Sequence, residues 1–203
     1  SAAQDGAAAA PPRGPGATRG EVSTPALKEW SAAVHAMLDG RQSVLLRKGG
    51  IHEKRFAVAA PEFVFFPTVA HGHRERVRPE HRELLDVAAA DSTEEAVTVR
   101  AGAKVIAAIA VNRPDGLGEL ADLHIWTPES VQADRLDFRP RHRLTVLVVQ
   151  AIPLTEPVRL PRTPVYAGCV SWVDLPLRPR WATPVRDDQA LAELAERVLS
   201  SVG

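Results

Sequence analysis

The sequence contains a single cysteine, Cys169, so the chain cannot form a disulfide within itself. One unpaired thiol fits a reducing compartment, and we expect a cytoplasmic protein. Apolar runs reach only about ten residues, which is too short to span a bilayer, so no membrane association is expected. The first residues lack a basic segment followed by an apolar one, so no signal peptide is predicted.

Charge of one sign is not in excess either, because 25 basic residues balance 25 acidic ones. No global basic character therefore argues for nucleic acid. The sequence also lacks the Gly-rich phosphate loops and the Gly-x-Ser-x-Gly nucleophile turn. A magnesium nuclease usually has an acid two places before a lysine, but Gly102 precedes Lys104 and His52 precedes Lys54 in this way. These absences argue against nucleotide-loop, serine-hydrolase and nuclease chemistry.

The composition is that of a globular protein, with 45% hydrophobic and 25% charged residues among 203. Residues 1–22 are dominated by Ala, Pro, Gly and Arg without an apolar face, and we expect a flexible tail. Residues 23–203 mix helix and strand signals without a regular repeat. They predict one compact α+β domain, with a mixed or small barrel-like sheet flanked by N- and C-terminal helices.

Local signals place the elements of this domain. A Thr-Pro pair at 24–25 predicts a helix that ends near Gly40, and the pair at 183–184 predicts a helix through Leu199. The apolar run at 144–151 predicts a strand buried on both faces. Further expected elements are strands at 42–47, at 63–66 (ended by Pro67) and at 96–111 (one or two, broken near Gly102), helices at 79–90 and 127–133, turns at 48–51 and 114–116, and an ordered, proline-rich loop region at 153–184.

Short characteristic stretches run from residue 26 to about residue 184. They lie at 26–30, 40–42, 45–51, 66–68 with His71, 124–126, 135–136 with 139–140, and 166–169 with 171–172. Together they resemble the bacterial family called domain of unknown function 1802, and the Arg-Lys-Gly-Gly-Ile run at 47–51 is the most specific piece. The family pattern has Gln where this chain has Gly72. The resemblance implies an uncharacterised protein associated with restriction-modification components.

The turn formed by Arg47, Lys48, Gly49 and Gly50 is the first candidate site. A strand that ends in two cations and two glycines brings backbone N–H groups close to a phosphate while the side chains neutralise it. The alternative is an ordinary β-turn with solvated charges.

Residues 41–82 carry a local basic excess, with nine cations against four carboxylates. Arg outnumbers Lys 21 to 4 in the chain, which suits bidentate phosphate contacts. Genomic base composition explains an arginine- and alanine-rich chain equally well. Four phenylalanines lie among these charges and either stack on bases or form core. They are Phe56, Phe63, Phe65 and Phe66.

Histidines gather just after the second predicted strand. In an extended chain His71, His73 and Glu75 would point to one side, and another His or Cys169 would complete a metal site. Because no spacing indicates the remaining ligands, no metal is predicted. Cys169 is either a nucleophile activated by a histidine or a small buried hydrophobic residue.

The residues at 40–42, leading into the strand at 45–47, are similar to small β-barrel modules of the pseudouridine-synthase-and-archaeosine-transglycosylase type, which bind RNA or modified bases. We therefore predict a module that binds RNA, DNA or another anionic ligand through the basic turn. In this hypothesis Arg47 and Lys48 contact phosphate, and His71 or Trp126 faces a base. The alternative is an enzyme of nucleic-acid or nucleotide metabolism with a His71-centred cleft. No cofactor is expected, and the predicted ligand-binding residues are Arg47, Lys48, Gly49, Gly50, His71, Trp126 and Arg135.

Overall fold

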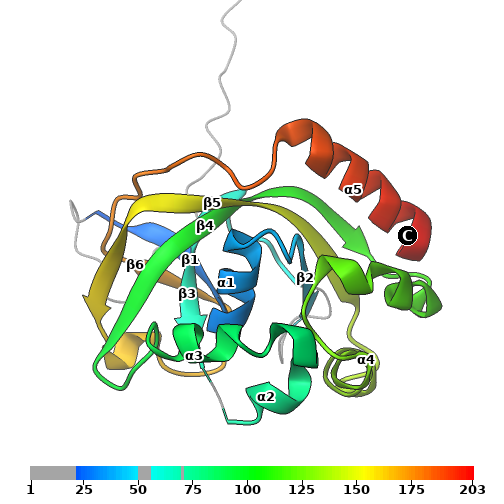
Figure 1. The fold of residues 1–203 in the computed structure, drawn as a ribbon, viewed down its shortest axis with the longest axis horizontal. Helices are drawn as coiled ribbons and strands as arrows, with labels where there is room; N and C mark the ends of the chain where they lie inside the picture. The colour runs from blue at the N-terminus through cyan, green and yellow to red at the C-terminus, as the bar shows by residue number, and fades with distance from the viewer. Residues whose placement is uncertain (1–21, 50–55, 70) are drawn as a thin grey trace, which may run out of the picture.

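A computed structural model describes residues 22–49, 56–69 and 71–203. Its centre is one open six-stranded sheet with the order β2-β5-β4-β3-β1-β6 (Figure 1). β1 and β3 run parallel, and the other neighbouring pairs run antiparallel. The strands are β1 (Thr24–Trp30), β2 (Val44–Lys48), β3 (Glu62–Thr68), β4 (Ala96–Ala110), β5 (Leu144–Pro161) and β6 (Trp172–Leu175). A mixed sheet with helices around it confirms the predicted α+β class.

The helices lie around this sheet (Figure 1). The α-helices are α1 (Ser31–Leu38), α2 (His73–Arg76), α3 (Leu84–Ala89), α4 (Pro128–Val131) and α5 (Asp188–Val202). Three segments are 3₁₀-helices, η1 (Pro79–His81), η2 (Pro114–Leu123) and η4 (Pro164–Tyr166). One segment, η3 (Gln132–Asp137), is a π-helix. No helix within the described ranges is long and apolar enough to cross a membrane.

The long strands β4 and β5 arch over α1 (Figure 1). Ala33 and Ala36 of α1 pack into one hydrophobic cluster, and Val34 and Met37 pack into a second. The first half of β5 is buried throughout: Val146 and Val148 belong to the first cluster, and Leu147 and Val149 to the second. This confirms the prediction of a strand buried on both faces at 144–151.

The helix predicted at 24–40 is wrong in its first half. Residues 24–30 form β1, which pairs with β3 on one side and β6 on the other, and only residues 31–38 are helical. Pairing on both sides satisfies the backbone of β1 and overrides the local Thr-Pro helix signal. A second proline also misleads, because Pro67 lies within β3 opposite Glu29 and does not end the strand.

Gly102 does not break β4, so the predicted break of the strand near this residue is wrong. A Cβ at this position would lie 2.1 Å from the Phe63 carbonyl oxygen and 2.5 Å from the Trp181 ring. The glycine therefore marks a close approach of β3 and Trp181 to a continuous strand.

The proline-rich region at 153–184 contains more regular structure than predicted. β5 continues to Pro161 and β6 follows at 172–175. β2 pairs with β5 only as far as Val148, so the prolines of β5 fall where that side of the strand has no partner strand among the described residues. The last helix begins at Asp188 and not at 184, and the Asp187 carboxylate caps it by accepting the Ala190 N–H at 2.8 Å.

The segment after α4 departs from ordinary helix geometry. The helix predicted to end near residue 133 continues as η3, a π-helical stretch in which the Phe138 N–H donates to the Ala133 carbonyl at 3.1 Å. Arg139 then adopts a left-handed backbone with φ of +48°. Both conformations are uncommon and recur at functional sites. They direct attention to this end of the molecule.

Candidate functional site

The C-terminal ends of β1 and β2 bring a carboxylate and a guanidinium together. Glu29 is only 4% exposed, and its Oε2 accepts a hydrogen bond from Arg47 Nη1 at 3.2 Å. Arg47 also donates to the Lys28 carbonyl at 3.0 Å and lies 5.0 Å from the centre of the Phe56 ring. These contacts from β1 and Phe56 hold the guanidinium of Arg47 in one place.

Arg135, on η3, lies in the electrostatic field of the same carboxylate. Its Nε is buried and has no hydrogen-bond partner among the described residues. Burial lowers the pKa of Arg135, Glu29 acts in the opposite direction, and Arg47 lowers it further. A guanidinium stays charged in proteins. The site therefore contains a half-buried guanidinium, with a buried Nε, near a carboxylate that is already hydrogen-bonded to Arg47.

Lys48 fastens the loop that follows η3. Its Nζ donates to the carbonyl oxygens of Phe138 and Arg139, the second at 2.9 Å. Burial, and after it the charge of Arg135, lowers the pKa of Lys48. Phe138 itself is 55% exposed, and the Arg139 guanidinium lies 4.9 Å from the centre of its ring. Lys48 thus holds an exposed aromatic ring and a further arginine beside Arg135.

These residues form one group with an excess of positive charge. The loop after η3 adds the exposed Arg141 and Arg143. Two neighbouring carboxylates are already engaged: Asp134 accepts from Arg76 Nε at 2.7 Å, and Asp137 accepts a side-chain hydrogen bond from within η3. We call the group the arginine cluster, and it consists of four cations and one carboxylate: Arg47, Lys48, Arg135, Arg139 and Glu29.

An aromatic stack borders the arginine cluster. Trp30 lies face to face with His73 at 3.5 Å and edge-on to Trp126 at 4.5 Å between ring centres. The Arg76 guanidinium lies 5.9 Å from the Trp30 ring, and Arg135 lines a small hollow with the two tryptophans. Burial, helped by Arg76, lowers the pKa of His73 to about 4. His73 is therefore neutral at neutral pH.

The predicted ligand-binding residues come together in part. Arg47, Lys48 and Arg135 belong to the arginine cluster, and Trp126 lines the hollow beside it. His71 is exposed just before α2. That these residues bind a ligand stays a prediction.

The turn itself is described only in part. The Gly49 carbonyl oxygen accepts a hydrogen bond from His142 Nδ1 at 3.1 Å, which ties the end of β2 to the loop after η3. Gly50 lies outside the described residues, so the predicted cradle of backbone N–H groups is not described.

The predicted extended strand through His71, His73 and Glu75 is wrong. Gly72 has φ of +83° and residues 73–76 turn into α2, which places the exposed His71 away from the buried His73. Within the described ranges, no three His, Cys, Asp or Glu side chains gather as a metal site would require. Cys169 is exposed, so the interpretation as a small buried hydrophobic residue is also wrong.

Part of the basic excess predicted at 41–82 is neutralised locally. Arg41 pairs with Asp39 and Glu83, while Arg78 donates to the carbonyls of His124 and Trp126. These arginines support the chain around α2 and α3. The four phenylalanines of the segment are 0–6% exposed and form core, so the base-stacking alternative is wrong for them.

Sequence reasoning missed the loop that completes the arginine cluster. Residues 138–143 read Phe-Arg-Pro-Arg-His-Arg, an aromatic residue followed by three arginines and a histidine in a single run. Such a run is a recognisable signal for an anionic partner. In the sequence, the basic excess at 41–82 is longer and gives a stronger signal than this run, but in the structure local ion pairs and hydrogen bonds reduce that excess.

Comparisons with known proteins give a family and several solved structures, three of which are named here. No curated protein matches the chain. One structure is ASCH from Zymomonas mobilis, with 10% identity and a TM-score of 0.40, and the match covers 88% of this chain and 95% of that chain. A single-substitution variant of the same protein has 13% identity and a TM-score of 0.38, over 64% of this chain and 72% of that chain. A second such variant has 11% identity and a TM-score of 0.37, over 88% of this chain and 98% of that chain. The sequence pattern of a family with no assigned function matches residues 26–197. The chain therefore belongs to the family described as a domain of unknown function, DUF1802.

Proposed function

We propose that this protein binds single-stranded nucleic acid, with the phosphates held by the arginine cluster. The observation that carries the proposal is Arg135, whose buried Nε has no partner among the described residues. A buried N–H group without a partner is costly, and proteins usually pair such a group. The single carboxylate of the cluster, Glu29, is hydrogen-bonded to Arg47. An anion from outside the chain would complete the site.

The geometry of an arginine side chain favours phosphate as that anion. A guanidinium presents several N–H donors in a rigid fork that matches phosphate oxygens, and its hydrogen bonds to an anion are about twice as strong as neutral ones. Arg47 is held by Glu29 and the Lys28 carbonyl, so it is ordered before a ligand arrives. Preorganised donors lose less entropy when they bind.

The surroundings of the cluster favour a nucleic acid over a free phosphate. Phe138 is 55% exposed beside Lys48 and Arg139, and exposed Arg141 and Arg143 extend the positive surface along the loop. Proteins that bind single strands combine such a basic track with aromatic rings on which unpaired bases stack. Bases within a duplex are stacked on each other and do not offer a free face to Phe138.

Fluorescence anisotropy tests the proposal with labelled single-stranded RNA and DNA of about 12 nucleotides and with the matching duplex. We expect the single strands to bind more tightly, with an affinity that falls steeply between about 50 and 200 mM salt. Arg135→Met should weaken binding by roughly tenfold or more, because one charge-assisted hydrogen-bonding group is lost.

Arg197→Met is the matched control. Arg197 is another arginine, but it forms an ion pair with Asp122 at 2.6 Å, lies on α5 and contacts η2. We expect this variant to bind as the unchanged protein does. Absence of binding at low salt, or equal losses in both variants, would contradict the proposal.

A further inference from the structure

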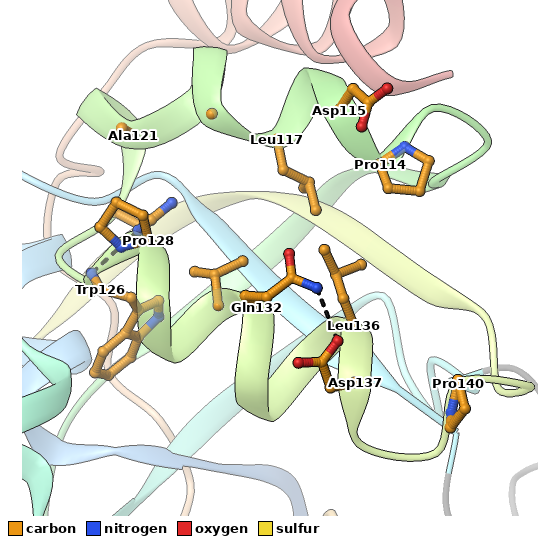
Figure 2. A pocket seen from close by; sticks show the side chains of 13 residues that line it. Pro114, Asp115, Leu117, Ala121, Trp126, Pro128, Gln132, Leu136, Asp137 and Pro140 are labelled. Carbon is orange, nitrogen blue, oxygen red and sulfur yellow. Dashed lines mark hydrogen bonds between the residues drawn. The ribbon is translucent and has the colours of Figure 1, made fainter.

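A groove opens on the side of η3 opposite the arginine cluster. It has a volume of about 580 Å³ and lies between η2 and the α4–η3 segment (Figure 2). This size is typical of sites that hold a small organic molecule. Its walls are largely apolar and include Leu117, Val131 and Leu136. Trp126 lines both this groove and the hollow next to Arg135.

His124 supplies the groove with a neutral hydrogen-bond donor. Its Nδ1 accepts the backbone N–H of Trp126 at 3.1 Å, so the ring proton resides on Nε2. Burial, followed by the charge of Arg78, lowers the pKa of His124 to about 4, which keeps the ring neutral at neutral pH. His124 is one of the residues that line the groove. A ligand there meets a donor whose tautomer is set by the backbone.

Gln132 and Asp137 supply the acceptors. Gln132 Nε2 donates to Asp137 Oδ1 at 2.8 Å, which orients the carboxamide and leaves its oxygen available. Figure 2 shows this carboxamide directed into the space between η2 and η3, with its oxygen on the side of Leu117. The groove thus offers an oriented amide oxygen and a carboxylate as acceptors.

The charge of the groove excludes phosphate. Its described lining contains two carboxylates, those of Asp115 and Asp137, and no lysine or arginine. An anionic ligand would be repelled there, whereas the arginine cluster across η3 attracts one. The two sides of this short segment therefore select ligands of different charge.

We propose that the groove binds an uncharged planar heterocycle that carries an amino group, as a free nucleobase or nucleoside does. The apolar walls of the groove can contact the faces of a flat ring. The polar groups of His124, Gln132 and Asp137 can form hydrogen bonds with the edge of that ring. An exocyclic amino group would donate to the Gln132 oxygen or to Asp137, and a ring nitrogen would accept from His124 Nε2. The proposal does not rest on nucleic-acid binding, because its ligand has no phosphate.

The test is a titration of the ¹⁵N-labelled protein with nucleosides, followed by two-dimensional NMR. Adenosine and inosine form one matched pair and cytidine and uridine another, because within each pair an amino group is replaced by an oxo group. We expect the amino member of at least one pair to shift the amide signals of Leu117, Gln132 and Leu136 and to bind about tenfold more tightly than its oxo partner.

Two variants locate the site. Gln132 is exposed, so Gln132→Ala should fold normally and lose about tenfold in affinity. His124→Asn keeps an acceptor for the Trp126 N–H but removes the donor at Nε2, and we expect a similar loss. Arg135→Met should leave nucleoside binding unchanged, which separates this proposal from the proposed function. No nucleoside shift at millimolar concentration, shifts outside the groove, or binding of a simple alkylamine in place of nucleosides would overturn it.

Discussion

Two charge clusters among the described residues are built differently. In the Asp91 cluster, which consists of His35, Asp91 and Arg100, the Asp91 carboxylate is 2% exposed and its Oδ2 lies 2.6 Å from His35 Nε2 and 2.7 Å from Arg100 Nε. One carboxylate there meets one guanidinium and one imidazole. The arginine cluster contains four cations and one carboxylate, which is hydrogen-bonded to Arg47, and Arg135 Nε has no partner among the described residues.

The difference lies in the balance of charge, because Asp91 is matched by its two neighbours while the cations of the arginine cluster outnumber their carboxylate. The Asp91 cluster ties the end of α3 to α1 and β4 through Oδ2, and its other oxygen, Oδ1, is also buried without a partner among the described residues. In the arginine cluster, keeping Arg135 Nε buried without a partner among the described residues costs stability. Substitutions should therefore act on stability at the first cluster and on binding at the second.

The largest effect on stability is expected at Asp91. Asp91→Asn removes the charge that Arg100 and His35 share, and we expect the free energy of unfolding to fall by about 3 kcal/mol. Arg135→Met, by contrast, removes a guanidinium whose buried Nε has no partner among the described residues, and it should raise stability by about 1 kcal/mol. Urea denaturation of both variants measures these changes, and nucleic-acid binding should persist in Asp91→Asn. If Arg135→Met unfolds the protein, the arginine cluster is structural too.

Acid should destabilise the protein through the histidines beside the arginine cluster. The pKa values of His73 and His124 are lowered from 6.5 to about 4, so the unfolded chain binds more protons than the folded chain between these pH values. The free energy of unfolding should therefore fall as the pH drops from 6.5 toward 4, by about 3 kcal/mol for each histidine at most.

A different pH range distinguishes the Asp91 cluster. Burial alone would raise the pKa of Asp91, but the hydrogen bonds from His35 and Arg100 outweigh it and the pKa is lowered below 3.8. The contribution of Asp91 to the free energy of unfolding is complete above pH 3.8 and is lost only in stronger acid.

Urea titrations at several pH values test the role of His73. In His73→Phe, the free energy of unfolding should fall less steeply between pH 6.5 and pH 4 than in the unchanged protein. An unchanged slope would show that His73 does not titrate in this way.

Phe138 should affect binding without affecting stability. Its ring is exposed, so Phe138→Ala should change the free energy of unfolding by about 0.5 kcal/mol or less. Loss of one stacked base should weaken single-strand binding by about 1–3 kcal/mol, while Phe138→Tyr should keep it. The salt dependence of binding should not change in either variant. Equal affinity of all three proteins in the anisotropy assay would remove stacking from the proposal.

The smallest effect is expected at Arg139. Arg139→Gly relieves a left-handed backbone at φ of +48° and should stabilise the fold by about 0.5–1 kcal/mol. The same variant removes one cation, so the slope of log affinity against log salt should decrease by about one. A denaturation curve and a salt series on one sample measure both. An unchanged slope would place Arg139 outside the interface.

The sequence predicted the parts of the fold that local patterns determine. The buried strand at 144–151 follows from an apolar run, and the end of α1 at Leu38 follows from Gly40 just beyond it, which has φ of +76°. β1 could not be predicted locally, because its strand conformation depends on pairing with β6, far along the chain. The same reason hides β6 within a stretch rich in proline.

The candidate site was predictable only residue by residue. Arg47, Lys48, Trp126 and Arg135 were each identified, but no spacing shows that β2, η3 and the segment between η2 and α4 bring them to one place. The sequence predicts that the cations at 41–82 are free to bind an anion, because it does not show the ion pairs that form only in the folded chain, such as that of Arg41 with Glu83. Phe138 was missed because exposure is decided by tertiary packing.

The pairing of β1 with β6 has a consequence for how the chain folds. Thr24 lies opposite Leu175, so one edge of the sheet joins residues from nearly opposite ends of the domain. Closing so large a loop must precede the contacts that reward it, and folds dominated by such distant pairings form slowly, on the scale of about milliseconds to seconds. During synthesis, β1 therefore waits with an unsatisfied edge until β6 has emerged. In that interval the nascent chain exposes a strand edge with which other chains can pair. We therefore expect chaperones to bind the nascent chain before β6 has emerged.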